Sequence, residues 1–408
     1  MSNAVRRTRA TLAAALVWTG LMAGLAGCTG GDLDLGGKPR SAGDTIRITP
    51  DDGAKGVAAD GRLEVTLADG RLERVRVTRI EDAQPAEVPG ALSQDGLRWR
   101  PDAGTRLALA AKYRVDAVAL DGHGRRSARH TTFTTLVPEH RFTTYFNPEN
   151  RSTVGTGMIV SFVFNRRIEA RAAVQRAIRI TSDPPVKVVG HWFDGQRLDF
   201  RPREYWKPGT KVTVELRLRD VEAAPGVFGV QQKTVGFTVG RSQISTVDVR
   251  QRTMEVRREG RLLATLPVTA GARRTTTYNG RMVVSEMFDV TRMNGATVGF
   301  KTRKGKSEYD IKDVPHAMRL TTSGTFLHGN YWADPSVFGY ENVSHGCVGL
   351  RDDKGGSQDS PAGWFFDRTL IGDVVEVVNS PDRKVDPWNG LSGWNMTWNE
   401  WLAGSAVG

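Results

Sequence analysis

Short runs of alternating or β-branched residues, separated by Gly, Pro, Asp and Asn, fill the chain from residue 45 onward. The first of these runs occupy residues 46–50, 62–68, 74–80, 97–101, 113–121 and 129–136. Several short strands with turn residues at this spacing are typical of a small antiparallel β-sandwich. We therefore expect a first folded domain at residues 45–137.

The same order of residues returns further along the chain. The segment LRWRPDAGTRLAL begins at Leu97 and LDFRPREYWKPGTKVTV begins at Leu198, and both place Arg-Pro ahead of Gly-Thr and a new strand. An internal repeat of this kind predicts a second, similar β-sandwich, which we place at residues 138–240. Within it, only residues 170–177 have a helical pattern.

Strands resume after residue 240 in a third unit, which we place at residues 241–380. Its first part contains the run Arg-Arg-Glu-Gly-Arg between two strand-like segments, which predicts a hairpin. The tail, residues 381–408, is rich in tryptophan, and Trp394, Trp398 and Trp401 suit one face of a short helix. We expect the tail to pack on the third unit; an exposed sugar-binding strip is the alternative. The fold is thus predicted to be mainly β.

The first 28 residues have the features of an export signal. Three arginines in the first nine residues precede an apolar run at residues 11–27, and no stop-transfer charges follow. This run has the length of a signal-peptide core, not of a membrane span. Residues 25–28, Leu-Ala-Gly-Cys, resemble a bacterial lipobox, which predicts lipidation of Cys28; an ordinary cleaved signal is the alternative. Residues 29–44, rich in glycine and charge, predict a flexible tether.

The cysteine content limits the possible roles of Cys347, and the net charge bears on the possible binding partners. The chain contains two cysteines, so if Cys28 is lipidated, Cys347 has no disulfide partner and is either an inert core thiol or a reactive one. In an exported protein, the net charge of +12 suits cell-wall polymers or membrane head groups rather than nucleic acid. A solvated basic surface explains this charge equally well, so we base no function on it.

The segment FLHGNYWADPSVFGYENVSHGCVGL, residues 326–350, has the parts of a cysteine nucleophile. A thiol attacks as a thiolate, so it needs a base within reach and donors for the charge on the attacked carbonyl oxygen. His328 and His345 are candidate bases, and Gly346 permits a tight turn whose amides can face an oxyanion. The residues between the two strand-like ends predict a functional loop that brings His328 beside Cys347. A buried structural thiol is the alternative.

This arrangement resembles the signature of the L,D-transpeptidases with a YkuD-type catalytic domain: a histidine, a loop, and then Ser-His-Gly-Cys at residues 344–347. The two sandwiches and the tail GWNMTWNEWLAG are similar to mycobacterial and other actinobacterial members with tandem immunoglobulin-like domains. The resemblance implies immunoglobulin-like domains at residues 45–137 and 138–240 and a catalytic domain at 241–380. We interpret both sandwiches as spacers between the lipid anchor and the catalytic domain.

The resemblance also implies the site residues. It makes Cys347 the nucleophile and His328 the general base, oriented by the backbone carbonyl of Gly329. The other implied roles are support of the thiolate by His345, an oxyanion hole from the amides of Gly346 and Cys347, and substrate contacts from Tyr309, Ser344 and Arg351. The family often has Asn two residues after the cysteine, where this chain has Gly349, and Arg351 is the candidate to compensate.

The implied reaction cross-links peptidoglycan. Cys347 would form a thioester with the third, diamino residue of a tetrapeptide stem and release D-Ala, and the amine of a neighbouring stem would resolve it into a 3-to-3 cross-link. The expected partners are the stem peptides, carbapenem β-lactams as inhibitors, and the outer face of the cell membrane through the lipid. No nucleic acid, metal or organic cofactor is expected, and we expect a monomer.

Three alternatives stay open from the residues alone. Water in place of the amine would make the protein an L,D-carboxypeptidase on the same acyl-enzyme. Zinc held by His328, His345 and Cys347 would need a fourth ligand, and no Cys-x-x-Cys or His-x-x-x-His pattern accompanies them. A catalytically silent cell-wall scaffold would keep the fold without the chemistry.

Overall fold

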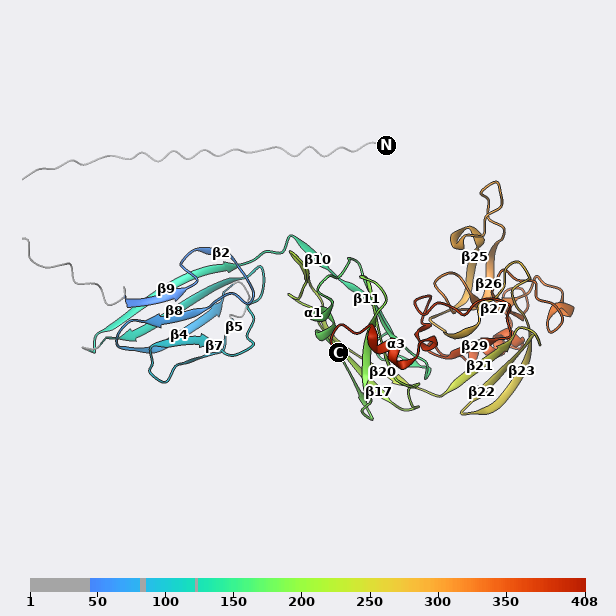
Figure 1. The fold of residues 1–408 in the computed structure, drawn as a ribbon, viewed down its shortest axis with the longest axis horizontal. Coiled ribbons are helices and arrows are strands. Elements are labelled where there is room, and N and C mark those ends of the chain that lie inside the picture. Colours follow the sequence, from blue (N-terminus) through green and yellow to red (C-terminus); the bar gives the residue numbers. More distant parts are fainter. Residues whose placement is uncertain (1–44, 81–85, 122–123) are drawn as a thin grey trace, which may run out of the picture.

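Three β-rich bodies follow one another along the chain (Figure 1). The structure is a computed structural model that describes residues 45–80, 86–121 and 124–408. The predicted signal peptide, Cys28 and the tether lie outside the described residues. Within the described ranges, no helix combines the length and the apolar character needed to cross a membrane.

The first body is a two-sheet β-sandwich, as the alternating runs predict. Its core contains Trp99 and the stacked rings of Tyr113 and Phe133, whose centroids lie 5.3 Å apart. One sheet has the order β1 (Ile46–Thr49), β3 (Glu64–Leu67), β7 (Arg98–Pro101), β6 (Gly90–Leu92). The other has the order β2 (Ala54–Val57), β9 (Arg126–Thr135), β8 (Lys112–Leu120), β4 (Arg71–Arg79), β5 (Ala86–Glu87).

The second body repeats this architecture and adds a short third sheet. The helical pattern at residues 170–177 forms α1 (Arg171–Arg176). One main sheet has the order β11 (Thr144–Asn147), β13 (Val160–Phe164), β16 (Arg197–Pro202), β15 (Val188–Trp192). The other has the order β12 (Thr153–Val154), β20 (Gln232–Val239), β17 (Lys211–Arg217), β14 (Ile178–Asp183). The short sheet has the order β10 (His140–Phe142), β19 (Val227–Gly229), β18 (Glu222–Ala224).

The third body is built on one long mixed sheet. Its strand order is β24 (Gly280–Val283), β29 (Val374–Val378), β21 (Gln243–Asp248), β22 (Thr253–Arg258), β23 (Arg261–Thr269), β28 (Val348–Arg351), β27 (Phe326–Asn330), β26 (Asp310–Arg319), β25 (Glu286–Asn294). The predicted hairpin is confirmed: β22 and β23 pair antiparallel, and Glu259 and Gly260 between them have positive φ. A helix that the sequence analysis missed, α2 (Pro361–Asp367), contacts β26, β27 and β28.

A long hairpin of β25 and β26 projects from this third body (Figure 1). Its end carries the 3-10 helix η2 (Gly295–Val298). A second 3-10 helix, η3 (Pro335–Val337), lies in the connection between β27 and β28. Both features flank the pocket described below.

The first half of the tail packs on the third body, as expected, whereas its end packs on the second: Val385 is buried in the core of the third body, and the Asn395 side chain hydrogen-bonds to the Arg281 backbone. The tail forms a 3-10 helix, η4 (Gly393–Asn395), and α3 (Trp398–Ala403), and the C-terminus returns to the second body (Figure 1). Trp401 is fully buried there, and its indole N–H donates to the Val189 carbonyl at 3.0 Å. Trp401 packs on the second body because Arg201 of β16 gives its indole a cationic partner: the buried guanidinium lies 4.4 Å from the Trp401 ring centroid.

The second sandwich and the third body share one hydrophobic core. Val283 of β24 and Trp394 of the tail are buried in the same cluster as the sandwich residues. Their backbones also meet, because Gly155 donates its N–H to the Ile371 carbonyl at 2.8 Å. A Cβ at Gly155 would overlap Asp373, so this approach requires glycine. The two bodies therefore form one packed unit.

Candidate active site

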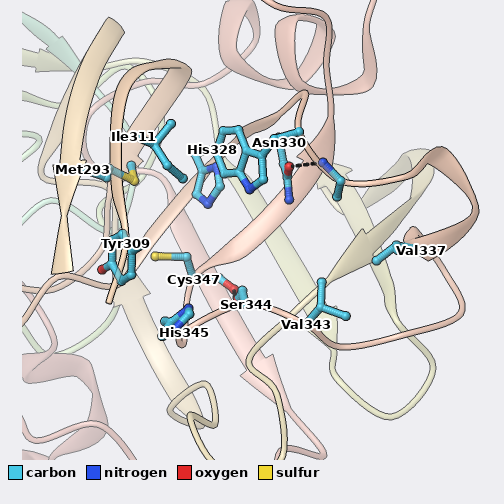
Figure 2. Close-up of a pocket in the computed structure, with 12 residues that line it drawn as sticks. Met293, Tyr309, Ile311, His328, Asn330, Val337, Val343, Ser344, His345 and Cys347 are labelled. Atoms are coloured by element: carbon cyan, nitrogen blue, oxygen red, sulfur yellow. Dashed lines mark hydrogen bonds between the residues drawn. The ribbon is translucent and has the colours of Figure 1, made fainter. Parts of the chain in front are cut away.

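A pocket of about 440 Å³ opens in the third body, between the β25–β26 hairpin and the ends of β27 and β28 (Figure 2). Most of its wall is apolar or aromatic. It is lined by Met293, Tyr309, Ile311, His328, Asn330, Trp332, Ala333, Val337, Val343, Ser344, His345 and Cys347.

Strand pairing brings the predicted nucleophile and base to this pocket. β27 and β28 are parallel neighbours, and their register places His328 opposite Gly349. Cys347 directly precedes β28, so it lies two residues before that position. Parallel neighbours need a crossover, and residues 331–347 supply it as the loop that the sequence predicts. The expected proximity of His328 and Cys347 in one pocket is confirmed.

His328 is held in one orientation. Its side chain is 4% exposed, and its Nδ1 lies 2.8 Å from the Gly329 carbonyl oxygen. A carbonyl only accepts hydrogen bonds, so Nδ1 carries the proton and Nε2 is the free acceptor. Trp332 stacks on the imidazole, with ring centroids 5.5 Å apart. Burial lowers the pKa of His328 below its usual 6.5, so the ring is neutral at pH 7.

Cys347 is protonated in this state. Its Sγ accepts a hydrogen bond from the Phe326 N–H at 3.4 Å and donates to the Gly324 carbonyl at 3.5 Å. Burial raises the pKa of the thiol to about 11. Figure 2 shows the sulfur turned toward Tyr309, with the His328 ring on the other side of the Cβ. The pair is therefore a neutral thiol beside a neutral imidazole.

The turn before Cys347 holds its donors and acceptors in hydrogen bonds of its own. Gly346 has a φ of 110°, and its N–H donates to Ser344 Oγ at 3.1 Å. The same hydroxyl donates to the Cys347 carbonyl at 2.6 Å. Ser344 therefore braces the turn while it also lines the pocket, and the Gly346 amide is occupied in this state. The Cys347 N–H has no hydrogen-bond acceptor among the described residues.

His345 supports the hairpin that covers the pocket. Its Nε2 lies 3.5 Å from a Glu308 carboxylate oxygen. Its ring packs against Tyr309 and Phe300, with centroids 4.9 and 5.4 Å away. Burial is the main cause that raises the pKa of Tyr309 to about 12, so its hydroxyl stays protonated and can donate. Tyr309 and His345 thus join the hairpin to the Ser-His-Gly-Cys turn.

Arg351 does not reach the pocket, contrary to expectation. It is exposed at the end of β28, and it is absent from the pocket wall. The space beside Gly349 is taken by Asn330, whose Nδ2 would lie 3.3 Å from a Cβ built on that glycine.

The sequence analysis did not name several of the pocket residues, and two of these carry polar or aromatic groups close to the base. Asn330 and Trp332 follow the base in the run His-Gly-Asn-Tyr-Trp. Residues two positions apart on a strand share a face, so the position of Asn330 relative to His328 was an available signal.

The proposed zinc geometry is not formed by the described residues. Nowhere in the described ranges do three or more His, Cys, Asp or Glu side chains converge as metal ligands would. His345 is directed toward Glu308 and the hairpin rings.

Comparisons with known proteins identify the family. The Bacterial Ig domain model matches residues 54–222, and the L,D-transpeptidase catalytic domain model matches residues 242–377. L,D-transpeptidase 2 of Mycobacterium tuberculosis (strain CDC 1551 / Oshkosh) is 34% identical over 355 residues, which cover 87% of this chain and 83% of that protein. The chain belongs to the L,D-transpeptidase family.

Other members of this family match over different lengths. L,D-transpeptidase 5 of Mycobacterium tuberculosis (strain ATCC 25618 / H37Rv) is 26% identical, covering 94% of this chain and 82% of that protein. An L,D-transpeptidase solved in complex with imipenem is 29% identical and covers 59% of this chain and 100% of that chain, with a TM-score of 0.48. The predicted fold class is confirmed: immunoglobulin-like β-structure precedes a YkuD-type catalytic domain, and a short helix follows at the C-terminus.

Proposed function

We propose that this protein forms 3-to-3 cross-links in peptidoglycan through a thioester on Cys347. One observation carries the proposal: a cysteine and an oriented, neutral histidine line the same largely apolar pocket. Family membership supports the reaction class. The residue roles below follow from the geometry and from general chemistry.

In the first half-reaction, Cys347 attacks the carbonyl carbon that joins the diamino residue to the terminal D-Ala of a donor stem. The thiol proton passes to Nε2 of His328 as the S–C bond forms, and the carbonyl oxygen becomes an oxyanion. The unpartnered N–H of Cys347 is the nearest backbone donor for that charge. When the tetrahedral intermediate collapses, the C–N bond breaks and His328 returns the proton to the leaving D-Ala amine.

In the second half-reaction, the side-chain amine of an acceptor stem attacks the thioester. His328 takes a proton from the attacking nitrogen and gives it to the Cys347 sulfur as the C–S bond breaks. The enzyme is regenerated and a new amide joins the two stems. Water in place of the amine would instead yield the L,D-carboxypeptidase reaction on the same thioester.

The neutral pair is suited to this mechanism. A thiol with a pKa of about 11 has almost no thiolate at pH 7, so proton transfer must accompany attack. The lowered pKa of His328 keeps the imidazole unprotonated and ready to accept that proton. The Cys347 sulfur must turn from the Gly324 carbonyl toward Nε2, and substrate binding is the event that displaces it.

The place of action is part of the same proposal. The predicted lipobox at Cys28 would anchor the protein on the outer face of the cell membrane, where the cell wall is built. Its partners there would be stem peptides, and β-lactams of the carbapenem class would acylate Cys347 as analogues of the D-Ala amide.

Intact-mass spectrometry of residues 45–408 incubated with imipenem tests the proposal. We expect a single covalent adduct on the wild type, none on Cys347→Ala, and roughly 100-fold slower adduct formation on His328→Ala, because general-base catalysis contributes about 10²–10⁴-fold. A parallel incubation with a tetrapeptide stem should release D-Ala and yield a cross-linked dimer. A folded wild type that forms no adduct would leave the scaffold alternative.

A further inference from the structure

Asn330 is a buried polar residue that the proposed chemistry does not use. It is the last residue of β27, its side chain is 5% exposed, and it forms part of the pocket wall. Its Oδ1 accepts a hydrogen bond from the Ala333 N–H at 3.0 Å. Because that N–H can only donate, the oxygen of the amide must face it, and the NH₂ end must face the other way.

The free end of the amide points into the pocket. Figure 2 shows Nδ2 of Asn330 directed toward the space between His328, Ser344 and Val343. Among the described residues, Nδ2 has no hydrogen-bond acceptor. The N–H₂ end therefore faces the open space of the pocket and is available to donate to a bound molecule.

Gly349 makes room for this side chain. A Cβ on Gly349 would lie 3.3 Å from Asn330 Nδ2 and 3.0 Å from Thr269 Cγ2, both tight contacts. A larger residue at 349 would therefore displace the amide. Asn330 and Gly349 stand on neighbouring strands, so a side chain at 349 would compete with the Asn330 amide for the same space.

The surrounding groups indicate what Nδ2 can bind. Ser344 Oγ and the Gly346 N–H are paired with each other, and Nδ1 of His328 is paired with Gly329. The pocket wall contains neither lysine nor arginine. A carboxylate buried against one neutral donor would remain uncompensated, whereas an uncharged carbonyl oxygen would be satisfied.

We propose that Asn330 is a substrate-binding residue whose Nδ2 donates a hydrogen bond to a backbone carbonyl oxygen of the donor stem peptide. The bond fixes the register of the stem and so places the scissile carbonyl at Cys347. This assignment rests on the proposed function, since it takes the stem peptide as the ligand.

The test measures binding separately from turnover. The full chain in detergent, carrying Cys347→Ala, is titrated calorimetrically with a synthetic tetrapeptide stem that ends in D-Ala. We expect Asn330→Ala in this background to raise Kd about tenfold, the effect of a lost hydrogen bond that leaves a carbonyl unpaired. Adding Gly349→Asn should recover most of the affinity, because it restores an amide from the neighbouring strand. A merely structural role of Asn330 would show no such recovery.

Two controls separate the possible failures. Gel filtration and a thermal melt of the Asn330→Ala protein should show a folded chain, so that a change in Kd reports lost binding and not unfolding. An unchanged Kd in Asn330→Ala, or a change that Gly349→Asn leaves uncorrected, would overturn the role of Asn330. Wild-type protein that binds the tetrapeptide but releases no D-Ala would instead overturn the proposed function, and a Kd shift in the variants would still support Asn330.

Discussion

The two sandwiches look alike but are joined to the rest of the molecule in different ways. The second shares a hydrophobic core with the catalytic domain and holds the C-terminal helix, whereas the first has a core of its own. A hydrogen bond from the Leu109 N–H to the Asp220 carboxylate, at 3.4 Å, links the two sandwiches. The first sandwich is therefore suited to be a movable spacer, and the second is a structural part of the enzyme.

The interpretation of both sandwiches as spacers stays a prediction, to which the structure adds that the second is also part of the catalytic unit's core. Repeated sequences fold into similar domains, but a shared interface depends on outward-facing residues that the repeat does not preserve. Arg100 and Arg201 occupy matching places in the repeat. Arg100 is exposed and pairs with Glu64, while Arg201 is buried among the tail tryptophans.

Deletion of one or both sandwiches is expected to have the largest effect. Removing residues 45–137 should leave the melting temperature of the remaining unit unchanged, because no core residue is lost from it. Removing residues 45–240 should abolish soluble folding, because Val283, Leu391 and Trp394 would lose their buried partners. Thermal melts and gel filtration of both truncated chains measure this. Equal behaviour of the two would show that the sandwiches are equivalent after all.

Trp401→Ala should weaken the joined unit most among single changes. The side chain is fully buried, and large aromatic-to-alanine changes in cores cost about 3–5 kcal/mol. We expect a lower melting temperature for the second sandwich and catalytic domain together. Calorimetry should show the first sandwich melting as before, and a shift of its transition would contradict the separation.

Arg201→Ala and Arg100→Ala form a matched pair across the repeat. Burial lowers the pKa of Arg201 to about 10, so the guanidinium is still charged at pH 7 and interacts with the surrounding rings. We expect its loss to cost roughly 2–3 kcal/mol. Arg100→Ala should cost less than about 1 kcal/mol, because its ion pair is largely exposed. Chemical denaturation measures both changes, and similar values would remove the distinction.

Acylation should not depend on the first sandwich. The pH profile of acylation is set by groups in the pocket. Because burial lowers the pKa of His328 below 6.5, the neutral imidazole can act as a base at neutral pH, and this activity is lost only as the pH falls below the lowered pKa. Alkylation by iodoacetamide, which needs thiolate, should keep rising toward the Cys347 pKa of about 11. The full chain and the chain without residues 45–137 should give superimposable profiles from pH 5 to 9. A displaced profile would indicate coupling between the domains.

The smallest effect is expected at the link between the sandwiches. Asp220→Gly removes the acceptor for Leu109 without backbone strain, because Asp220 has a φ of 61° that glycine readily adopts. Stability should change by less than about 0.5 kcal/mol. Small-angle scattering should detect a wider range of domain orientations. A marked loss of stability would mean that the link is structural.

Part of the fold could be predicted because its signal is local. Alternation of apolar and polar residues marks the strands, and the Glu-Gly-Arg turn marks the hairpin that joins β22 and β23. The missed helix α2 also had a local signal, since Ser360 and Pro361 form a typical helix start. Its run Gly-Trp-Phe-Phe was too short to show helical periodicity.

The candidate site also has features that the sequence predicts and features that it does not. The cysteine, the histidine and the intervening loop are readable from their spacing. The hydrogen bonds and the exposure of the neighbouring residues could not be predicted in this way. The turn geometry decides that the Gly346 N–H donates to Ser344, and the course of β28 decides that Arg351 is exposed outside the pocket.

The sequence by itself determined the β-architecture, the tandem repeat and the presence of Cys347 and His328 in one pocket, because strand alternation, turn residues and a contiguous motif are written in local order. Only the tertiary structure decided where the tail packs, which sandwich belongs to the catalytic unit and which polar groups are free in the pocket. These outcomes depend on contacts between residues far apart in the chain, such as Arg201 with Trp401 and Asn330 with Gly349, and on how burial changes the pKa of each group.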